Sequence, residues 1–164
     1  MGEGKEISSS KNGYLVMVTK NGIIKKIDGT SFDNVRHSGL IAIKLKKDDL
    51  LSWVKLTGGS SEIMLATRAG QSIRFSEKDV RPMGRNASGV KAMRLKKNDE
   101  IVGMDIVEGD KSQIANYKLR VVMDNGYGKK TELKQYKKQR RSGSGIKTAK
   151  ITHKTGNVIS AKIL

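Results

Sequence analysis

Short apolar runs separated by polar turns make up this chain, and their spacing is that of β-strands. Residues 14–19 form the first run, a Lys-Asn-Gly turn follows at residues 20–22, and apolar positions resume at residues 23–27. An Asn-Gly pair between two such runs is a strong signal for a β-hairpin. No window keeps apolar residues at the i, i+3, i+4 and i+7 positions of a helix over several turns. The pattern therefore predicts an all-β fold.

The hairpin pattern returns twice, at residues 63–75 and 119–133. A polar loop with a glycine near its end follows each hairpin, and the segments that begin at Gly39 and Gly89 align without gaps, 50 residues apart. After the glycine we expect a third strand, at residues 40–45 in the first copy, and then a turn and a fourth strand. Four strands in about 50 residues are typical of a propeller blade.

These repeats divide the chain into a polar tail and three blade repeats. We place the tail at residues 1–10 and the repeats at residues 11–58, 59–118 (including a linker) and 119–164. Three blades are too few to close a propeller of about 4–8 blades, and the last predicted strand runs to Leu164. We therefore expect an open arc of about three four-stranded blades, half of a larger ring, with open blade ends through which copies could self-associate.

Composition narrows the function. The net charge of +17 and the pI of about 10.1 indicate an anionic partner. The chain has no cysteine, no apolar stretch long enough to span a membrane, and two isolated histidines, His37 and His153. Acidic pairs at residues 48–49 and 99–100 recur one repeat apart in predicted turns, which favours a turn role over catalysis. We expect a cytoplasmic, non-catalytic domain without metal or cofactor.

Cations recur in phase with the repeats. Equivalent positions of a ring of blades fall on one rim, so these side chains should form a curved positive stripe that follows a bent duplex by neutralising phosphates. The alternative is a solvated basic surface that keeps the protein soluble. The predicted DNA-binding residues are Lys25, Lys26, Arg36, Lys44, Lys46, Lys47, Arg74, Arg81, Arg85, Arg94, Lys96, Lys97, Lys129, Lys130, Lys137, Lys138, Gln139, Arg140, Arg141 and Lys147.

The densest of these sites is a basic, glycine-containing loop at residues 137–146. Its run Gln-Arg-Arg-Ser-Gly-Ser-Gly at residues 139–145 is similar to the box motif Q-[RK]-R-G-G-[RK]-G in the C-terminal domain of the DNA gyrase A subunit. Residues 39–45, 80–90 and 125–131 resemble the same domain. Two departures are Ser142 in place of a glycine and Ser144 in place of the second basic residue. The box also lies in the last repeat here, whereas the family has it in the first blade.

The resemblance implies a six-bladed β-pinwheel in which neighbouring blades exchange strands and double-stranded DNA wraps around a basic perimeter. It also implies two protein partners, the remainder of the gyrase A subunit plus the gyrase B subunit, in an ATP-dependent DNA topoisomerase that supercoils DNA in the bacterial nucleoid. The related C-terminal domain of the topoisomerase IV A subunit has the same blade pattern and remains an alternative. From other classes, the alternatives are a basic β-repeat module that binds RNA and one that docks an acidic protein.

Overall fold

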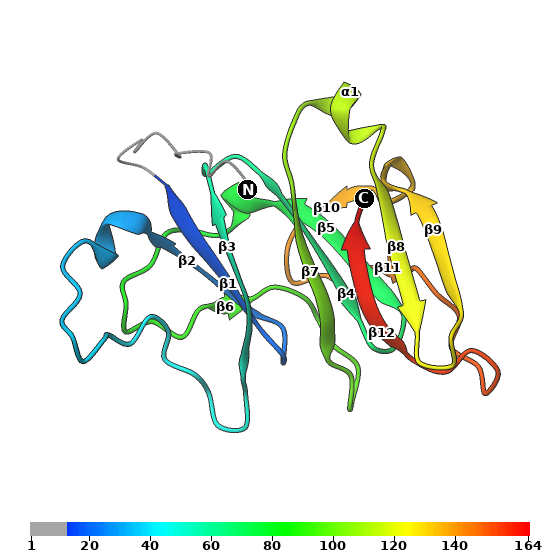
Figure 1. Cartoon of the computed structure of the whole chain (residues 1–164), viewed down its shortest axis with the longest axis horizontal. Coiled ribbons are helices and arrows are strands. Elements are labelled where there is room, and N and C mark those ends of the chain that lie inside the picture. The colour runs from blue at the N-terminus through cyan, green and yellow to red at the C-terminus, as the bar shows by residue number, and fades with distance from the viewer. Residues whose placement is uncertain (1–12) are drawn as a thin grey trace, which may run out of the picture.

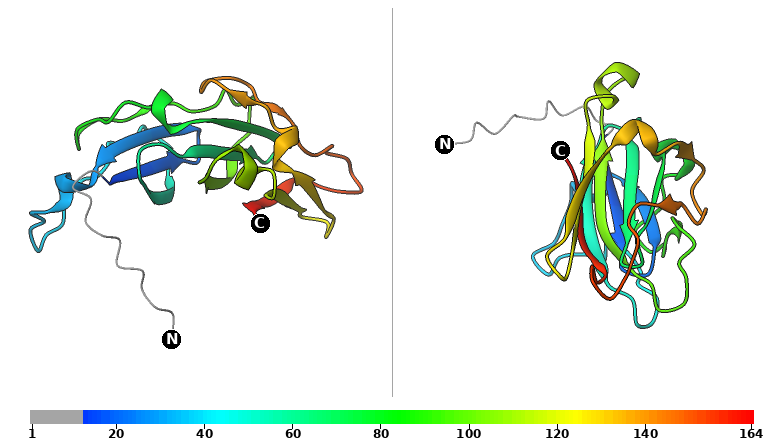
Figure 2. Two further views of the ribbon diagram at one scale, coloured as in Figure 1. Left: turned by 90° about the horizontal axis from the view of Figure 1, so that it is seen from above. Right: turned by 90° about the vertical axis from the view of Figure 1, so that its right-hand side faces the viewer.

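Three β-sheets follow one another along the chain and form an arc. The computed structural model describes residues 13–164, and the predicted tail, residues 1–10, lies outside them. Within the described residues the sheets lie side by side in chain order (Figure 1). Seen from above, the row of sheets is bent (Figure 2), with both ends turned toward the same side. The arc is open, as the repeat count predicts.

The first sheet combines three strands of the first unit with one strand of the second. In spatial order it contains β3 (Leu51–Thr57), β1 (Tyr14–Thr19), β2 (Ile23–Asp28) and β6 (Val90–Lys91). Neighbouring strands are antiparallel. The 3-10 turn η1 (Gly29–Phe32) follows β2 and is capped by the Asp28 side chain.

The second sheet has the same construction with two donated strands. Its own strands are β7 (Ile101–Val107), β4 (Glu62–Thr67) and β5 (Gln71–Ser76), and η2 (Glu77–Asp79) follows β5. The third unit adds β10 (Lys138–Gln139), which is parallel to β5, and β11 (Ile146–Lys147), which is antiparallel to it. The third sheet contains only β12 (Val158–Ile163), β8 (Lys118–Met123) and β9 (Gly128–Glu132), in that spatial order. In the chain, η3 (Leu133–Gln135) follows β9.

The three hairpins lie where the sequence predicts them, but the strand after each loop is absent in the first unit and shorter than predicted in the second. Residues 40–45, predicted as a strand, lie outside every strand, and residues 90–95 form only the short β6. The reason is that this segment pairs with the outer strand of the preceding sheet, β2 in the case of β6. No described strand precedes β1, so residues 40–45 have no partner of this kind. The linker also contains an unpredicted helix, α1 (Lys111–Ile114), with a capping box at Asp110.

Backbone hydrogen bonds fix each donated segment against the hairpin turn of the preceding unit. Ala92 N donates to Gly22 O at 2.8 Å, and at the next junction Thr148 N donates to Gly70 O at 2.8 Å. Gly70 has φ +82°, and a side chain on it would collide with the carbonyl oxygen of Ala149. Glycine is needed here both for the left-handed turn and for the close approach of the donated backbone.

Two of the three hydrophobic clusters lie between units, and the third, around Met17, Ile27 and Ile43, lies within the first unit. One cluster joins Val16 and Ile24 of the first unit to Leu65 and Met93 of the second. Another joins Met64 and Val107 of the second unit to Leu119, Val121 and Leu133 of the third. Each unit therefore buries its apolar face on its neighbour, as repeat arrays do.

Lys25 is fully buried, although the sequence nominates it as a DNA contact. Its Nζ donates to the carbonyl oxygens of Ala42 and Arg85, both at 2.7 Å, and of Ala87, at 3.0 Å. Three acceptors match the three donors of an ammonium group, while desolvation by burial lowers the pKa of Lys25. Its side chain fastens the loop of the second unit to the first, so it is not free to contact a phosphate.

Lys25→Met should destabilise the fold by about 1–3 kcal/mol, because three carbonyl oxygens at the junction would lose their donor. Lys129 occupies the same position in the third unit but is exposed, so Lys129→Met should change the free energy of unfolding by less than about 0.5 kcal/mol. Urea denaturation of both variants measures the difference, and equal stabilities would contradict the fastening role.

Candidate nucleic-acid interface

Three basic segments lie next to one another, two of them on the outer side of the arc and the first at its N-terminal end. We call residues 34–45, 81–95 and 137–151 the outer segments. Lys44 N donates to Ala87 O at 3.2 Å, and Arg94 N donates to Gly143 O at 2.8 Å, so each segment is bonded to the next. In the view from above, residues 81–95 and 137–147 run along the outer side of the bend, opposite β3, β7 and β12 (Figure 2). Backbone hydrogen bonds thus join three separate loops into one continuous surface.

The outer segments have an unbalanced charge. Together they contain twelve Lys and Arg residues and not one Asp or Glu, whereas the whole chain has 33 basic and 16 acidic residues. Most of the net charge of +17 is therefore concentrated in about a quarter of the chain. Such a surface attracts polyanions, and the attraction weakens as salt screens it.

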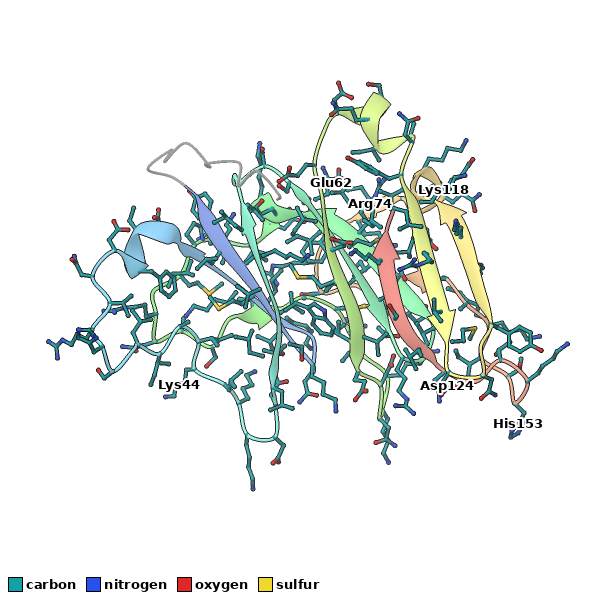
Figure 3. The ribbon with its side chains drawn as sticks, in the orientation of Figure 1. Lys44, Glu62, Arg74, Lys118, Asp124 and His153 are labelled. Carbon is teal, nitrogen blue, oxygen red and sulfur yellow. The ribbon has the colours of Figure 1, made fainter. Side chains whose placement is uncertain are left out.

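Most of the predicted DNA-binding side chains are exposed. Lys46, Lys47, Lys96 and Lys97 belong to the turns that precede β3 and β7, along one edge of the arc (Figure 1). Lys44, labelled in Figure 3, points away from the body of the molecule. The other exposed members of the predicted set are Arg36, Arg81, Arg85, Arg94, Lys129, Lys130, Lys137, Lys138, Arg140 and Lys147.

The box-like loop is fastened to the second unit by its second arginine. Arg141 Nε donates to Asp79 O at 2.9 Å, and its Nη1 donates to Lys91 O at 3.1 Å. Ser142 adopts a left-handed φ of +70°, and its N donates to Ala92 O at 2.7 Å. The guanidinium of Arg141 is therefore occupied by the protein, whereas Arg140 is exposed beside it and lines a shallow open depression with Asp79.

Two other predicted contacts are held inside the structure. Lys26 is 4% exposed; its Nζ donates to Glu77 O at 3.1 Å and lies 5.0 Å from the centre of the Tyr14 ring. Arg74 lies beside the carboxylate of Glu62 at 3.5 Å, with its side chain 11% exposed. Lys26, like Lys25 and Arg141, links neighbouring units, whereas Arg74 pairs within the second sheet. None of these side chains is free to contact a phosphate. Gln139 is half-buried in β10.

Sequence reasoning missed two exposed cations of the outer segments. Lys91 on β6 occupies the same position as Lys147 on β11, two residues after the loop glycine. Lys150 is the third-unit equivalent of Lys44 and Arg94. Both could have been found from the repeat alignment, and the complete lack of acidic residues in all three segments was a further signal.

The acidic pairs are turn residues, as the sequence indicates. Asp49 Oδ1 accepts hydrogen bonds from Asn21 N at 3.0 Å and Leu50 N at 2.8 Å. One repeat later Asp99 Oδ1 accepts from Ala69 N and Glu100 N at 2.9 and 2.8 Å. Asp49 thus holds the turn before β3 against the β1–β2 turn, and Asp99 holds the turn before β7 against the β4–β5 turn.

Similarity to known proteins agrees with the architecture. A family described as "DNA gyrase C-terminal domain, beta-propeller" matches residues 13–57, 61–108 and 124–164. The chain is 41% identical over 150 residues to the DNA gyrase A subunit of Staphylococcus epidermidis and 40% identical over 155 residues to that of Staphylococcus aureus. These alignments cover 92% and 94% of the chain but only 16% and 17% of the two relatives, so the chain spans about one-sixth of their length.

Solved structures give the same result. The C-terminal domain of DNA topoisomerase IV superposes with a TM-score of 0.86 at 30% identity, over 93% of this chain and 46% of that one. A DNA gyrase A C-terminal domain superposes with a TM-score of 0.80 at 26% identity, over 94% of this chain and 50% of that one. No helix within residues 13–164 is long and apolar enough to cross a membrane.

Fold and surface together define an open, propeller-type β-array in which a unit donates strands to the preceding sheet and whose outer side is basic. The chain belongs to the DNA gyrase C-terminal domain family.

Arg141 should contribute to the stability of the fold, whereas Arg140 should not. Arg141→Ala removes the hydrogen bonds that fasten the box-like loop, and we expect it to lower the free energy of unfolding by about 1–3 kcal/mol. Arg140→Ala removes an exposed side chain and should change it by less than about 0.5 kcal/mol. Thermal or urea unfolding of the two variants provides the measurement. A greater loss of stability in Arg140→Ala would contradict the assignment.

Proposed function

We propose that this chain binds double-stranded DNA without sequence preference and bends it around the outer side of the arc. The observation that carries the proposal is the run of outer segments with twelve basic and no acidic residues, joined edge to edge by backbone hydrogen bonds. A duplex presents phosphates at regular intervals along a smooth path, which this surface can neutralise in succession. Base readout is not required, because phosphate contacts carry no sequence information.

Phosphate contacts can offset the energy of bending. Bending a site of about 20–30 base pairs by about 40–90° costs on the order of 1–6 kcal/mol. Several phosphate contacts release enough counterions to offset that cost at moderate salt. The contacts we propose come from the exposed side chains of the outer segments, with the turn lysines Lys46, Lys47, Lys96 and Lys97 at the edge of the surface.

In a longer polypeptide the same surface would serve a type IIA topoisomerase. The matched relatives are DNA gyrase A subunits, while solved neighbours include domains of both gyrase and topoisomerase IV. We propose that the chain acts as a non-catalytic DNA-wrapping domain of a gyrase A subunit, together with the remainder of that polypeptide and the gyrase B subunit, in the bacterial cytoplasm. Identities of 40–41% to gyrase sequences favour gyrase over topoisomerase IV.

RNA binding is the weaker candidate. Single-stranded RNA is recognised largely by stacking its bases on aromatic side chains. Aromatic residues make up 4% of the chain, and Tyr127, which is 42% exposed, is the most exposed large aromatic of the described residues. The outer segments contain no Phe, Trp or Tyr. A backbone-binding surface for duplex DNA fits this composition better.

The salt dependence of binding tests the electrostatic part of the proposal. Arg94→Ala/Arg140→Ala should weaken duplex binding on the order of tenfold and lower the slope of log K against log salt by about 2, because each lost phosphate contact removes about 0.9 from the slope. Lys111→Ala/Lys134→Ala is the matched control, since both lysines are exposed but lie on α1 and η3, outside the outer segments.

Fluorescence anisotropy on several unrelated duplexes at a series of salt concentrations gives the slopes. Equal losses across all sequences support phosphate binding. Losses confined to some sequences, or tighter binding to structured RNA than to duplex DNA, would contradict it.

Bending can be separated from binding by closing nicked plasmid with ligase in the presence of the chain. Wrapping around a fixed arc should shift the linking-number distribution in one direction, in proportion to the bound protein. The Arg94→Ala/Arg140→Ala variant should shift it less at the same protein concentration. Full binding without any shift would show that the chain binds but does not wrap DNA.

A further inference from the structure

The box-like loop lies beside a short turn of the second unit that presents one carboxylate. That turn is η2, and its last residue, Asp79, lines the same shallow depression as Arg140, Arg141 and Ser142. Arg141 Nε donates to Asp79 O at 2.9 Å, so the loop of the third unit is fixed against the turn of the second. The depression thus contains two guanidinium groups and one carboxylate, which lowers its local positive charge.

The other carboxylate of this turn anchors it. Glu77 is fully buried; its Oε1 accepts a hydrogen bond from Thr57 Oγ1 at 2.6 Å, and its Oε2 accepts one from Ser61 N at 3.1 Å. Lys26 Nζ also donates to Glu77 O, at 3.1 Å. Because η2 is held by these contacts, the carboxylate of Asp79 stays beside the box-like loop.

The carboxylate of Asp79 has no bonding partner of its own. Asp79 is half-buried, and no hydrogen bond or ion pair within residues 13–164 involves its side chain. Arg140 is exposed and takes part in no ion pair among the same residues. The negative charge of Asp79 therefore acts on any group that approaches Arg140, and it repels a phosphate.

The acid and the arginine occur together at the second junction, and neither occurs at the first. Counted from the hairpins, the first-unit equivalent of Asp79 is Ser31, and counted from the loop glycines, the second-unit equivalent of Arg140 is Gly84. Ser31 lies in η1, which is a 3-10 turn like η2. The turn therefore forms without an acid at this position, and the fold alone does not account for Asp79.

We propose that Asp79 is a counter-charge that weakens the hold of the box-like loop on a DNA phosphate. A phosphate bound by the guanidinium of Arg140 comes close to the carboxylate, and the repulsion between the two anions cancels part of the attraction. The inference rests on the proposed DNA binding and concerns the regulation of the same surface. A phosphate at this loop is held less tightly than the arginines alone would hold it, so it is released more readily.

Asp79→Asn keeps the size of the side chain and removes its charge. It should tighten duplex binding on the order of threefold to tenfold at low salt, the effect of one unit charge close to a phosphate at a protein surface. Fluorescence anisotropy with a duplex of about 30 base pairs measures the change. Glu108→Gln is the matched control, because it raises the net charge equally at an exposed position in the linker before α1. It should change the affinity less than about twofold.

The salt dependence shows whether the gain is electrostatic. The ratio of affinities between Asp79→Asn and the unchanged chain should fall as salt rises from about 0.01 M to about 0.15 M, because the Debye length shortens from about 30 Å to about 8 Å. A ratio that is independent of salt, or an equal gain in Glu108→Gln, would contradict a local counter-charge.

A double-mutant cycle tests whether Asp79 acts through the box-like loop. If the carboxylate repels a phosphate that Arg140 binds, Asp79→Asn should change the affinity less than about twofold when Arg140→Ala is already present. The same gain with and without Arg140 would show that the repelled phosphate lies elsewhere, and it would overturn the proposal.

A purely structural role for Asp79 predicts the opposite sign. If the carboxylate served only to hold the box-like loop, Asp79→Asn would lower the urea midpoint of unfolding and weaken DNA binding. We expect an unchanged midpoint and tighter binding. Weaker or equal binding by Asp79→Asn, when the unchanged chain binds duplex DNA, overturns this inference alone. Failure of both chains to bind duplex DNA overturns the proposed function as well.

Discussion

The donation of a short segment to the preceding sheet is the interaction on which the rest of this structure depends. Ala92 and Thr148 each bond through their N–H to a glycine carbonyl in the turn of the unit before. Both turns need glycine for a left-handed φ of +82°, and at Gly70 the donated backbone also leaves no room for a Cβ. The loop that carries each donated segment is drawn onto the neighbouring unit. A unit taken alone would leave an apolar face and a strand edge uncovered.

Two consequences follow from this joint. The two larger cores form between units, so the sheets are held at a fixed angle to one another and the array bends as one piece. The outer segments, joined by backbone hydrogen bonds, bring their basic residues into one surface, and the segments themselves contain no acidic residue. The same segments therefore set the bend of the array and supply the positive charge of its surface. This combination fits the proposed bending of DNA.

Local pattern was enough to predict the hairpins, since Asn21-Gly22 and its two equivalents lie between apolar runs and fix strand pairing within a unit. Pairing between units was not predictable in this way. Residues 40–45 and 90–95 are similar in sequence, yet only the latter reach a strand to pair with. Lys25 and Lys129 likewise occupy equivalent positions, but one is buried under the next unit's loop and the other is exposed. These differences in pairing and burial depend on whether a neighbouring unit packs on the residue. The repeat pattern of the sequence is the same in either case and does not predict them.

The most direct measurement is the rate of lysine acetylation at each site, read by mass spectrometry with and without a duplex of about 30 base pairs at low salt. In the free chain Lys25 should react far more slowly than the exposed lysines, because its ammonium group is bonded to three carbonyl oxygens. Duplex DNA should protect Lys44, Lys91, Lys147 and Lys150 of the outer segments and leave Lys78, Lys111 and Lys134 reactive. Equal protection of both groups, or protection of the second group alone, would contradict binding along the outer segments.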